Sequence, residues 1–206
     1  MVQHFSPPKS LHSNRLGAAF YGRPTAVVAK ELIGKALLHH VDGQWLGGWI
    51  VETEAYLDQG DPASHSARGK TASNASMFSD PGTLYVYPIH AKHCLNAVTQ
   101  PADQGAAVLI RAIEPVWGLD VMRRLRGYDD VRRLTRGPAM LCQALQIDRG
   151  DDGRCLVSDE RIGVFTDSIP RVPVIRATKR IGISKAKHRN LRFVDVNSEY
   201  LSRKVE

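Results

Sequence analysis

The sequence has little that points to a membrane, an export route or a metal centre. No apolar run among its 206 residues approaches the roughly 18 that a membrane-spanning helix needs. The N-terminal residues lack the basic start and apolar middle of a signal peptide. The three cysteines, Cys94, Cys142 and Cys155, lie far apart without a Cys-x-x-Cys pair, which argues for a reducing compartment and against zinc or iron–sulfur ligation. We therefore expect a cytoplasmic protein with no membrane partner and no metal.

Positive charge exceeds negative charge, with 28 lysines and arginines against 21 acids and a net charge of +7. The excess is concentrated in two stretches. The first contains Arg123, Arg124, Arg126, Arg132, Arg133 and Arg136, and the second contains Lys179, Arg180, Lys185, Lys187, Arg189 and Arg192. Two basic clusters suit a polyanion, because each neutralised phosphate releases condensed counterions. A basic surface that serves solubility is the alternative, although arginine favours bidentate phosphate binding.

Length and element order predict one α+β domain with a curved, mostly antiparallel β-sheet flanked by helices. We expect residues 1–15 to form a flexible arm and residues 16–206 to form the domain. Helical spacing with Gly or Pro boundaries predicts helices at 24–34, 115–127 and 138–147. Apolar patterns predict strands at 36–41, 45–56, 83–89 and 106–113, then short strands at 155–158, 172–176 and 191–194. Residues 57–82 form a loop long enough to be functional.

The run Val51-Glu-Thr-Glu-Ala-Tyr56 places unusual side chains on one strand face. Because successive strand residues alternate, Glu52, Glu54 and Tyr56 share a face, and the opposite face fits a core. Acids are rarely buried unless they are paired or used. This face could serve a reaction on a flat aromatic substrate, or it could simply be solvated. The hexapeptide alone favours the solvated face.

Seven segments in one order make the sequence far more specific. They are Gly48–Leu57, Ser64-His-Ser66, Met77-Phe78, Pro81–Tyr87, Cys94-Leu-Asn96, Arg111-Ala-Ile-Glu-Pro115, and Arg136-Gly-Pro with Leu141–Leu145. Together they resemble the alkyladenine (3-methyladenine) DNA glycosylase family of base-excision repair, over nearly the whole chain. The resemblance implies an enzyme that flips alkylated or deaminated purines, of the 3-methyladenine, hypoxanthine and ethenoadenine class, from double-stranded DNA and hydrolyses the N-glycosidic bond with water. It implies no cofactor, and we expect a monomer.

The resemblance also implies roles for the matching residues. Glu54 looks like the general base that orients the attacking water, and Arg111 is similar to the arginine that holds this water and the adjacent phosphate. Tyr56, His65 and Tyr87 match residues that sandwich and contact the flipped base. The chemistry needs such groups, because glycosidic cleavage builds positive charge on the sugar and base flipping loses stacking.

Further positions carry implied roles or differ from the family pattern. Asn96 looks like the residue that discriminates against the exocyclic amino group of guanine, and Leu109 matches an apolar residue near the sugar and the water. His90 stands where the family has a tyrosine wedge, which intercalates in the DNA and fills the gap left by the flipped nucleotide. An imidazole fills less of this gap, and the segment before Cys94 is one residue short. We expect the chemistry to survive while DNA affinity and lesion preference change.

Structural alternatives remain for several of these residues. Tyr85 and Tyr87 share a strand face and could flank one slot if their strand lies beside the strand of Glu54, but strand tyrosines are usually core aromatics. Arg111 could simply pair with Glu114 or with the first acid of the hexapeptide.

Functional alternatives also remain. A non-catalytic DNA-binding module of the same fold would bind DNA without releasing a base. A small-molecule hydrolase could use Glu52 and Glu54 as paired acids, but it would not explain the basic clusters. A metal enzyme could be built from Asp58, Asp61 and His65, although their spacing matches no established pattern.

Overall fold

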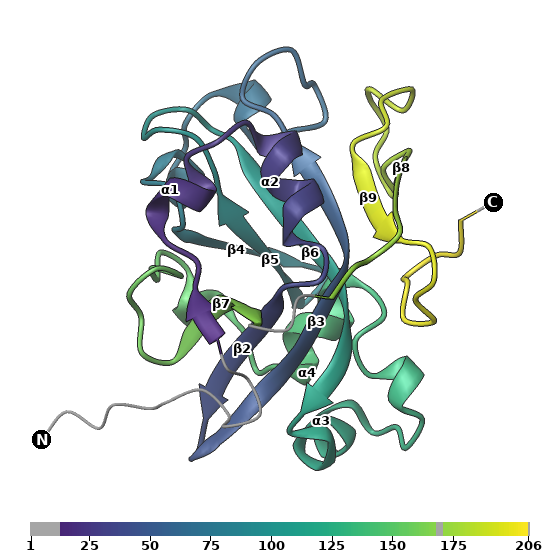
Figure 1. Ribbon diagram of the computed structural model, residues 1–206. Coiled ribbons are helices and arrows are strands. Elements are labelled where there is room, and N and C mark those ends of the chain that lie inside the picture. The colour runs from purple at the N-terminus through teal and green to yellow at the C-terminus, as the bar shows by residue number, and fades with distance from the viewer. Residues whose placement is uncertain (1–12, 168–170, 206) are drawn as a thin grey trace, which may run out of the picture.

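The computed structural model of the protein describes residues 13–167 and 171–205. Its main feature is a nine-stranded sheet in which all the described strand pairs are antiparallel. The order across the sheet is β1 (Ser13–Arg15), β7 (Ile162–Asp167), β2 (Ala36–Val41), β3 (Gln44–Tyr56), β6 (Ala107–Trp117), β5 (Lys92–Val98) and β4 (Leu84–Ile89). β9 (Arg192–Asp195) pairs with β3 and with β8 (Ile175–Thr178) at one side of the sheet (Figure 1).

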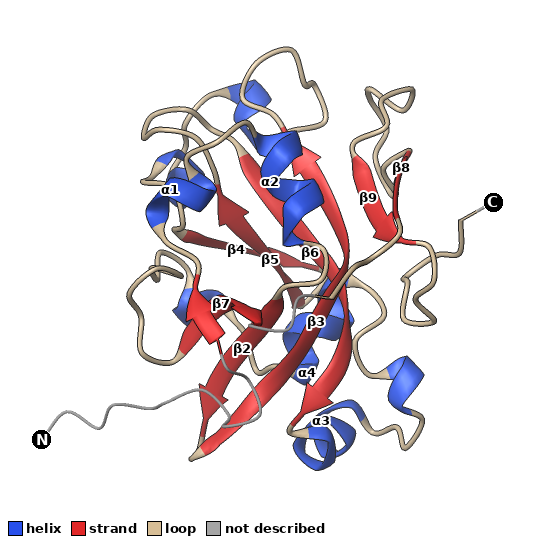
Figure 2. Ribbon diagram, in the orientation of Figure 1, coloured by secondary structure: helices blue, strands red, loops and turns tan. Residues whose placement is uncertain are grey.

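Helices flank the curled sheet (Figure 2). α1 (Ala18–Tyr21) and α2 (Thr25–Leu32) precede β2, and α2 packs on β3 and β6. α3 (Leu119–Arg126) and α4 (Pro138–Ala144) follow β6, and α4 packs on β5 and β6. Short 3-10 helices lie in the loops: η1 (His65–Arg68), η2 (Ala75–Phe78), η3 (Val131–Arg133) and η4 (Arg149–Asp151). The predicted α+β class with a curved, mostly antiparallel sheet is confirmed. Within the two described stretches, no helix is both long and apolar enough to cross a membrane.

The main core forms between these helices and the sheet. Val28 and Leu32 are four residues apart and therefore lie on one side of α2. They join one buried cluster with Ile50 of β3, Ile110 of β6 and Leu141 of α4. This cluster holds the middle strands rigidly, so side chains at the ends of β3 and β6 have a fixed frame.

β3 begins at the predicted hairpin turn. Asp42 and Gly43 both have positive φ, 48° and 80°, as a two-residue turn between antiparallel strands requires. Further along β3, a β-carbon on Gly48 would overlap the carbonyl oxygen of Glu114 on β6. Glycine at position 48 therefore permits the close approach of β3 and β6.

Register shifts interrupt the pairing of β3 with β6 at Gly47/Gly48 and on both sides of Glu52. Val51 on β3 and Arg111 on β6 each lack an opposite residue, because the register shifts on both sides of Glu52. Val51 consequently packs with Val194 and Leu201 in a small separate cluster rather than in the main core. Bulges redirect side chains and are common beside active sites.

Residues 90–105, between the predicted strands at 83–89 and 106–113, contain a strand that was not predicted. They contain β5, which pairs with β4 and β6. Residues 94–98 are buried on both faces, so β5 shows no polar–apolar alternation that would reveal a strand.

Other boundaries also differ from the prediction. Pro115 belongs to β6 rather than to a helix start, and Gly118, with a left-handed φ of 76°, separates β6 from α3. Residues 155–158 form turns rather than a strand, with one isolated bridge between Cys155 and Thr83, the residue before β4. The strand β7 was not predicted. Residues 13–15 of the expected arm form β1, and residues 1–12 lie outside the described residues.

Candidate active site

A cavity of about 750 Å³ lies beside the end of β3. Its walls come from β3, β4, β5, β6, the region of η1, the start of α4 and residues 181–185 after β8. The predicted site residues that line it are Tyr56, His65, Tyr87, Asn96, Leu109 and Arg111. β4 is not beside β3, because β6 and β5 lie between them. The curl of the sheet nevertheless brings Tyr85 and Tyr87 to the same cavity as Tyr56.

Glu54 lies beneath this lining and is fully buried. Its Oε2 accepts hydrogen bonds from the Tyr56 hydroxyl at 2.8 Å and from Nη1 of Arg111 at 3.3 Å. Its Oε1 accepts a hydrogen bond from the backbone N–H of Ile181 at 2.7 Å. All three donors belong to residues that line the cavity. The solvated-face interpretation of the hexapeptide is therefore wrong.

Glu52 is also fully buried, but its partners differ. Its Oε1 accepts hydrogen bonds from Nε of Arg111 at 2.9 Å and from Nε of Arg192 at 2.8 Å. Ser202 donates its backbone N–H to Oε2 of Glu52 at 2.6 Å and its hydroxyl to Oε1 at 2.7 Å. Burial alone would raise the pKa of Glu52, but Arg111, Arg192 and Ser202 hold this pKa below its usual value. Glu52 thus anchors Arg111 and the C-terminal segment.

Arg111 bridges the two acids. The alternative pairing with Glu114 does not occur, because Glu114 pairs with Arg171 at 2.6 Å. Burial would lower the pKa of Arg111, yet the carboxylates of Glu54 and Glu52 outweigh burial and raise this pKa above its ordinary value. A guanidinium that stays charged therefore stands in the cavity wall.

His65, Tyr85 and Tyr87 form an aromatic wall. The ring of His65 meets that of Tyr87 at 67° with centroids 4.5 Å apart, and Tyr85 lies 5.5 Å from Tyr87. Nδ1 of His65 and the Tyr85 hydroxyl share a hydrogen bond of 2.9 Å. Burial, and then the charge of Arg68, lowers the pKa of His65, which favours the neutral ring. Burial also raises the pKa of Tyr85 to about 12. This wall and the ring of Tyr56 are surfaces on which a flat ring could stack.

Asn96 and Leu109 are register partners on β5 and β6, and both line the cavity. Nδ2 of Asn96 donates a hydrogen bond to the carbonyl oxygen of Tyr85 at 2.9 Å. Asn96 therefore lines the cavity with its side-chain amide bound to the backbone of β4.

His90 is exposed at the tip of the β4–β5 hairpin. Ile89 pairs with Lys92, so His90 and Ala91 are the two turn residues, with φ values of 45° and 60°. Left-handed backbone costs residues other than glycine about 1–2 kcal/mol each. Ile89, the residue before this turn, lines the cavity. A tight two-residue turn therefore joins β4 to β5.

Comparison with known proteins supports the resemblance read from the motifs. The profile of a family described as methylpurine-DNA glycosylase matches residues 19–199. The chain belongs to the methylpurine-DNA glycosylase family. A Rhodopirellula baltica protein named "Putative 3-methyladenine DNA glycosylase" is 51% identical over 194 residues, which cover 91% of this chain and 82% of that protein. The DNA-3-methyladenine glycosylase of Mus musculus is 42% identical, over 97% of this chain and 64% of the mouse protein.

In this member of the methylpurine-DNA glycosylase family, sequence reasoning missed the segment that closes the cavity over Glu54. Arg180 forms a bidentate ion pair with Asp61 at 2.6 and 2.7 Å, and its guanidinium lies 4.7 Å from the centre of the Tyr56 ring. The next residue, Ile181, supplies the N–H that binds Glu54. Arg180 was visible only as one member of a basic cluster. No local pattern joins it to Asp61, which is 119 residues away.

The side chains of the alternative metal site bind other groups. Asp58 accepts a hydrogen bond from the N–H of Gly105 at 2.8 Å, and Asp61 is occupied by Arg180. No cluster of three histidine, cysteine or acidic residues within residues 13–167 and 171–205 could hold a metal ion.

Asp61→Asn is expected to lower the free energy of unfolding by about 3 kcal/mol, because it leaves the buried Arg180 guanidinium without its countercharge. Both side chains of this pair are 0% exposed. Urea denaturation followed by circular dichroism measures the loss. Asp103→Asn is the matched control: that carboxylate is 87% exposed and 3.5 Å from Lys70, so we expect a change below about 1 kcal/mol. Equal losses in the two variants would contradict a structural role for the Asp61 pair.

Proposed function

We propose that this protein is a base-excision-repair glycosylase that hydrolyses the N-glycosidic bond of alkylated or deaminated purines in double-stranded DNA. The substrates are of the 3-methyladenine, hypoxanthine and ethenoadenine class. The observation that carries the proposal is the buried carboxylate of Glu54, held by three donors against an aromatic cavity. Membership of the methylpurine-DNA glycosylase family supports the same substrate class.

In the proposed reaction Glu54 is the general base. An ionised carboxylate offers about four acceptor positions, and protein donors occupy three of them here. The fourth position is left for the attacking water. Arg111, which contacts Oε2 of Glu54 at 3.3 Å, helps to hold this water and the adjacent phosphate. Glu54 orients this water for attack, and the negative carboxylate stabilises the positive sugar.

Bond changes in this step balance without a cofactor. The water oxygen bonds to C1′ of the sugar as the C1′–N bond breaks, and the bonding electron pair leaves with the base. Glu54 accepts a proton from the water. A purine methylated at N3 or N7 carries positive charge and leaves as a neutral base. Hypoxanthine and ethenoadenine are neutral in the nucleotide, so each takes up a proton from solvent as it leaves.

The cavity side chains supply recognition in this proposal. Tyr56, His65 and Tyr87 stack on the flipped base and recover part of the stacking free energy lost on flipping. Asn96 excludes the exocyclic amino group of guanine, and Leu109 packs near the sugar. We further propose that the protein acts as a monomer. The free state of all three cysteines supports a reducing, cytoplasmic location.

The decisive assay uses duplex DNA with one hypoxanthine or one ethenoadenine, followed by alkaline cleavage of abasic sites. We expect strand breaks at the lesion and none in an undamaged duplex of the same sequence. Folded protein that yields no break at any such lesion would overturn the proposal. Lesion binding without base release would instead identify a non-catalytic DNA-binding module.

His90→Ala is expected to weaken binding to a lesion-containing duplex by about tenfold, because the side chain at the hairpin tip then fills none of the gap behind the flipped base. His90→Tyr should strengthen this binding, since a phenol fills more of the gap. Fluorescence anisotropy with lesion-containing and undamaged duplexes measures both effects. Affinity changes of the same size on the two duplexes would remove His90 from the wedge role.

A further inference from the structure

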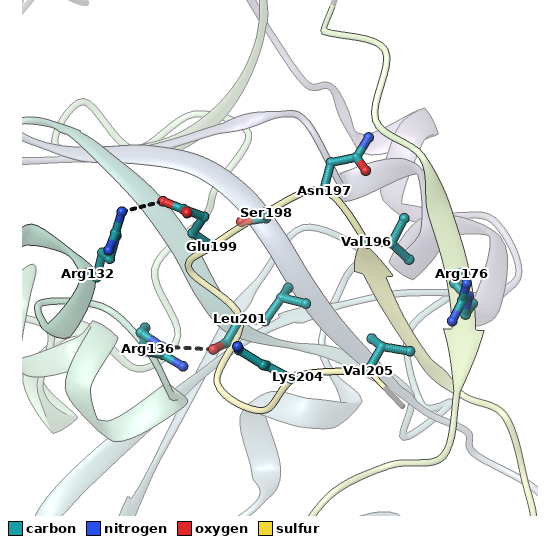
Figure 3. Close-up of a pocket in the computed structure, with 10 residues that line it drawn as sticks. All are labelled: Arg132, Arg136, Arg176, Val196, Asn197, Ser198, Glu199, Leu201, Lys204 and Val205. Carbon is teal, nitrogen blue, oxygen red and sulfur yellow. Dashed lines mark hydrogen bonds and ion pairs between the residues drawn. The ribbon is translucent and has the colours of Figure 1, made fainter.

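A second cleft, of about 600 Å³, lies between η3, β8 and the chain after β9. Three arginines, one lysine and a single acid line it: Arg132, Arg136, Arg176, Lys204 and Glu199. Figure 3 shows Arg132 and Arg136 on one side of the cleft, Arg176 on the other and Lys204 between them. The cations come from three separate segments of the chain, so only the tertiary fold gathers them.

Much of this positive charge is uncompensated. Glu199 pairs with Arg132 at 2.8 Å, and Arg136 uses its Nε to donate to the carbonyl oxygen of Leu201 at 2.9 Å. Arg176 and Lys204 are exposed, and neither forms an ion pair with an acid within residues 13–167 and 171–205. Cations held together in this way repel one another, and an anion between them removes this repulsion.

The cleft shares a wall with the proposed catalytic site. Leu201 and Lys204 line the cleft, while Ser202 between them donates to Glu52 and accepts a hydrogen bond from Arg111. On the other side of the cleft, the backbone of Arg136 forms an isolated β-bridge with Ala112, the residue that follows Arg111 on β6. Two residues further on, the chain reaches the base cavity at Pro138, the first residue of α4.

We propose that this cleft binds backbone phosphates of the DNA strand that flanks the flipped nucleotide. The proposal rests on the proposed function and extends the DNA-binding surface beyond the base cavity. Arginine binds phosphate oxygens with its planar fork, and such contacts position a duplex without reading its sequence. Phosphates in the cleft hold the C-terminal segment against Glu52 and Arg111 while the base is in the cavity.

The first test compares the salt dependence of duplex binding for the full chain and for R176A/K204A. Each lost phosphate contact lowers the slope of log affinity against log salt by about 0.9, so we expect a fall of about 1.8 and affinity at least about tenfold weaker near 0.1 M salt. The matched control is K30A/R161A, which removes two exposed cations outside the cleft, from α2 and the turn before β7. The control should keep the slope of the unmodified protein.

The second test scans uncharged methylphosphonate linkages along the strand that carries the lesion. At the position that faces the cleft, the neutral linkage should weaken binding of the unmodified protein but not of R176A/K204A. Equal slopes for the two double variants, or no linkage with this selective effect, would overturn the proposal. Alkaline cleavage of the same duplex by the unmodified protein reports base release separately, so failure of the cleft and failure of the proposed function are distinguishable.

Discussion

Glu54→Gln is expected to slow base release by at least about a thousandfold while it leaves lesion binding within a few-fold. The amide cannot accept the proton of the attacking water, and it removes the negative charge beside the developing positive sugar. It also replaces one acceptor oxygen by an NH₂ group, which faces a donor among Tyr56, Arg111 and Ile181. Single-turnover kinetics on a hypoxanthine duplex measures the rate, and anisotropy measures the affinity.

The same substitution elsewhere on the sheet provides the control. Glu114 lies on β6 and pairs with Arg171 at 2.6 Å, on the outer side of the molecule rather than at the cavity. We expect Glu114→Gln to keep full turnover. Glu54→Asp, which retains the charge but draws it back by one methylene, should lose less rate than Glu54→Gln. Turnover of Glu54→Gln equal to that of Glu114→Gln would show that Glu54 is not the general base.

Glu52→Gln is expected to lower the free energy of unfolding by about 3–5 kcal/mol, the largest stability effect in the site. The Glu52 carboxylate is fully buried between Arg111 and Arg192, and it also binds Ser202. Removing its charge leaves two arginines close together in a buried position, with one countercharge, Glu54, beside Arg111. Urea denaturation measures the loss. A change below about 1 kcal/mol, as for an exposed pair, would contradict this account.

The pH dependence of stability should report the same cluster. The folded-state pKa of Glu52 is lowered from its ordinary value of 4.5, because Arg111 and Arg192 outweigh the effect of burial. Its stabilising contribution is therefore complete above pH 4.5 and is lost as the pH falls through the folded-state pKa. We expect the stability of the unmodified protein to fall more steeply below this pH than that of Glu52→Gln. Parallel curves would assign the acid sensitivity to other carboxylates.

Local patterns in the sequence determined the elements from which the site is built. A strand alternates with a period of two, which predicted that Glu52, Glu54 and Tyr56 share a face if residues 45–56 form a strand. The contacts of Arg111 with both acids, and of Tyr56 with Glu54, agree with this placement. The Asp-Gly turn and the helix at 25–32 likewise follow from local conformational preferences. The ordered motifs predicted the family, which the family profile confirms.

Only the tertiary structure decided whether those acids meet water or protein. Ile181 reaches Glu54 across 127 residues of sequence, and Ser202 reaches Glu52 across 150. Such contacts depend on how β8, β9 and the C-terminal segment pack, and no short-range periodicity encodes them. The bulge at Arg111 and the curl of the sheet are collective results of pairing seven strands in one order. The sequence by itself therefore determined which side chains share a strand face, and the long-range packing decided their burial, their partners and the cavity that they line.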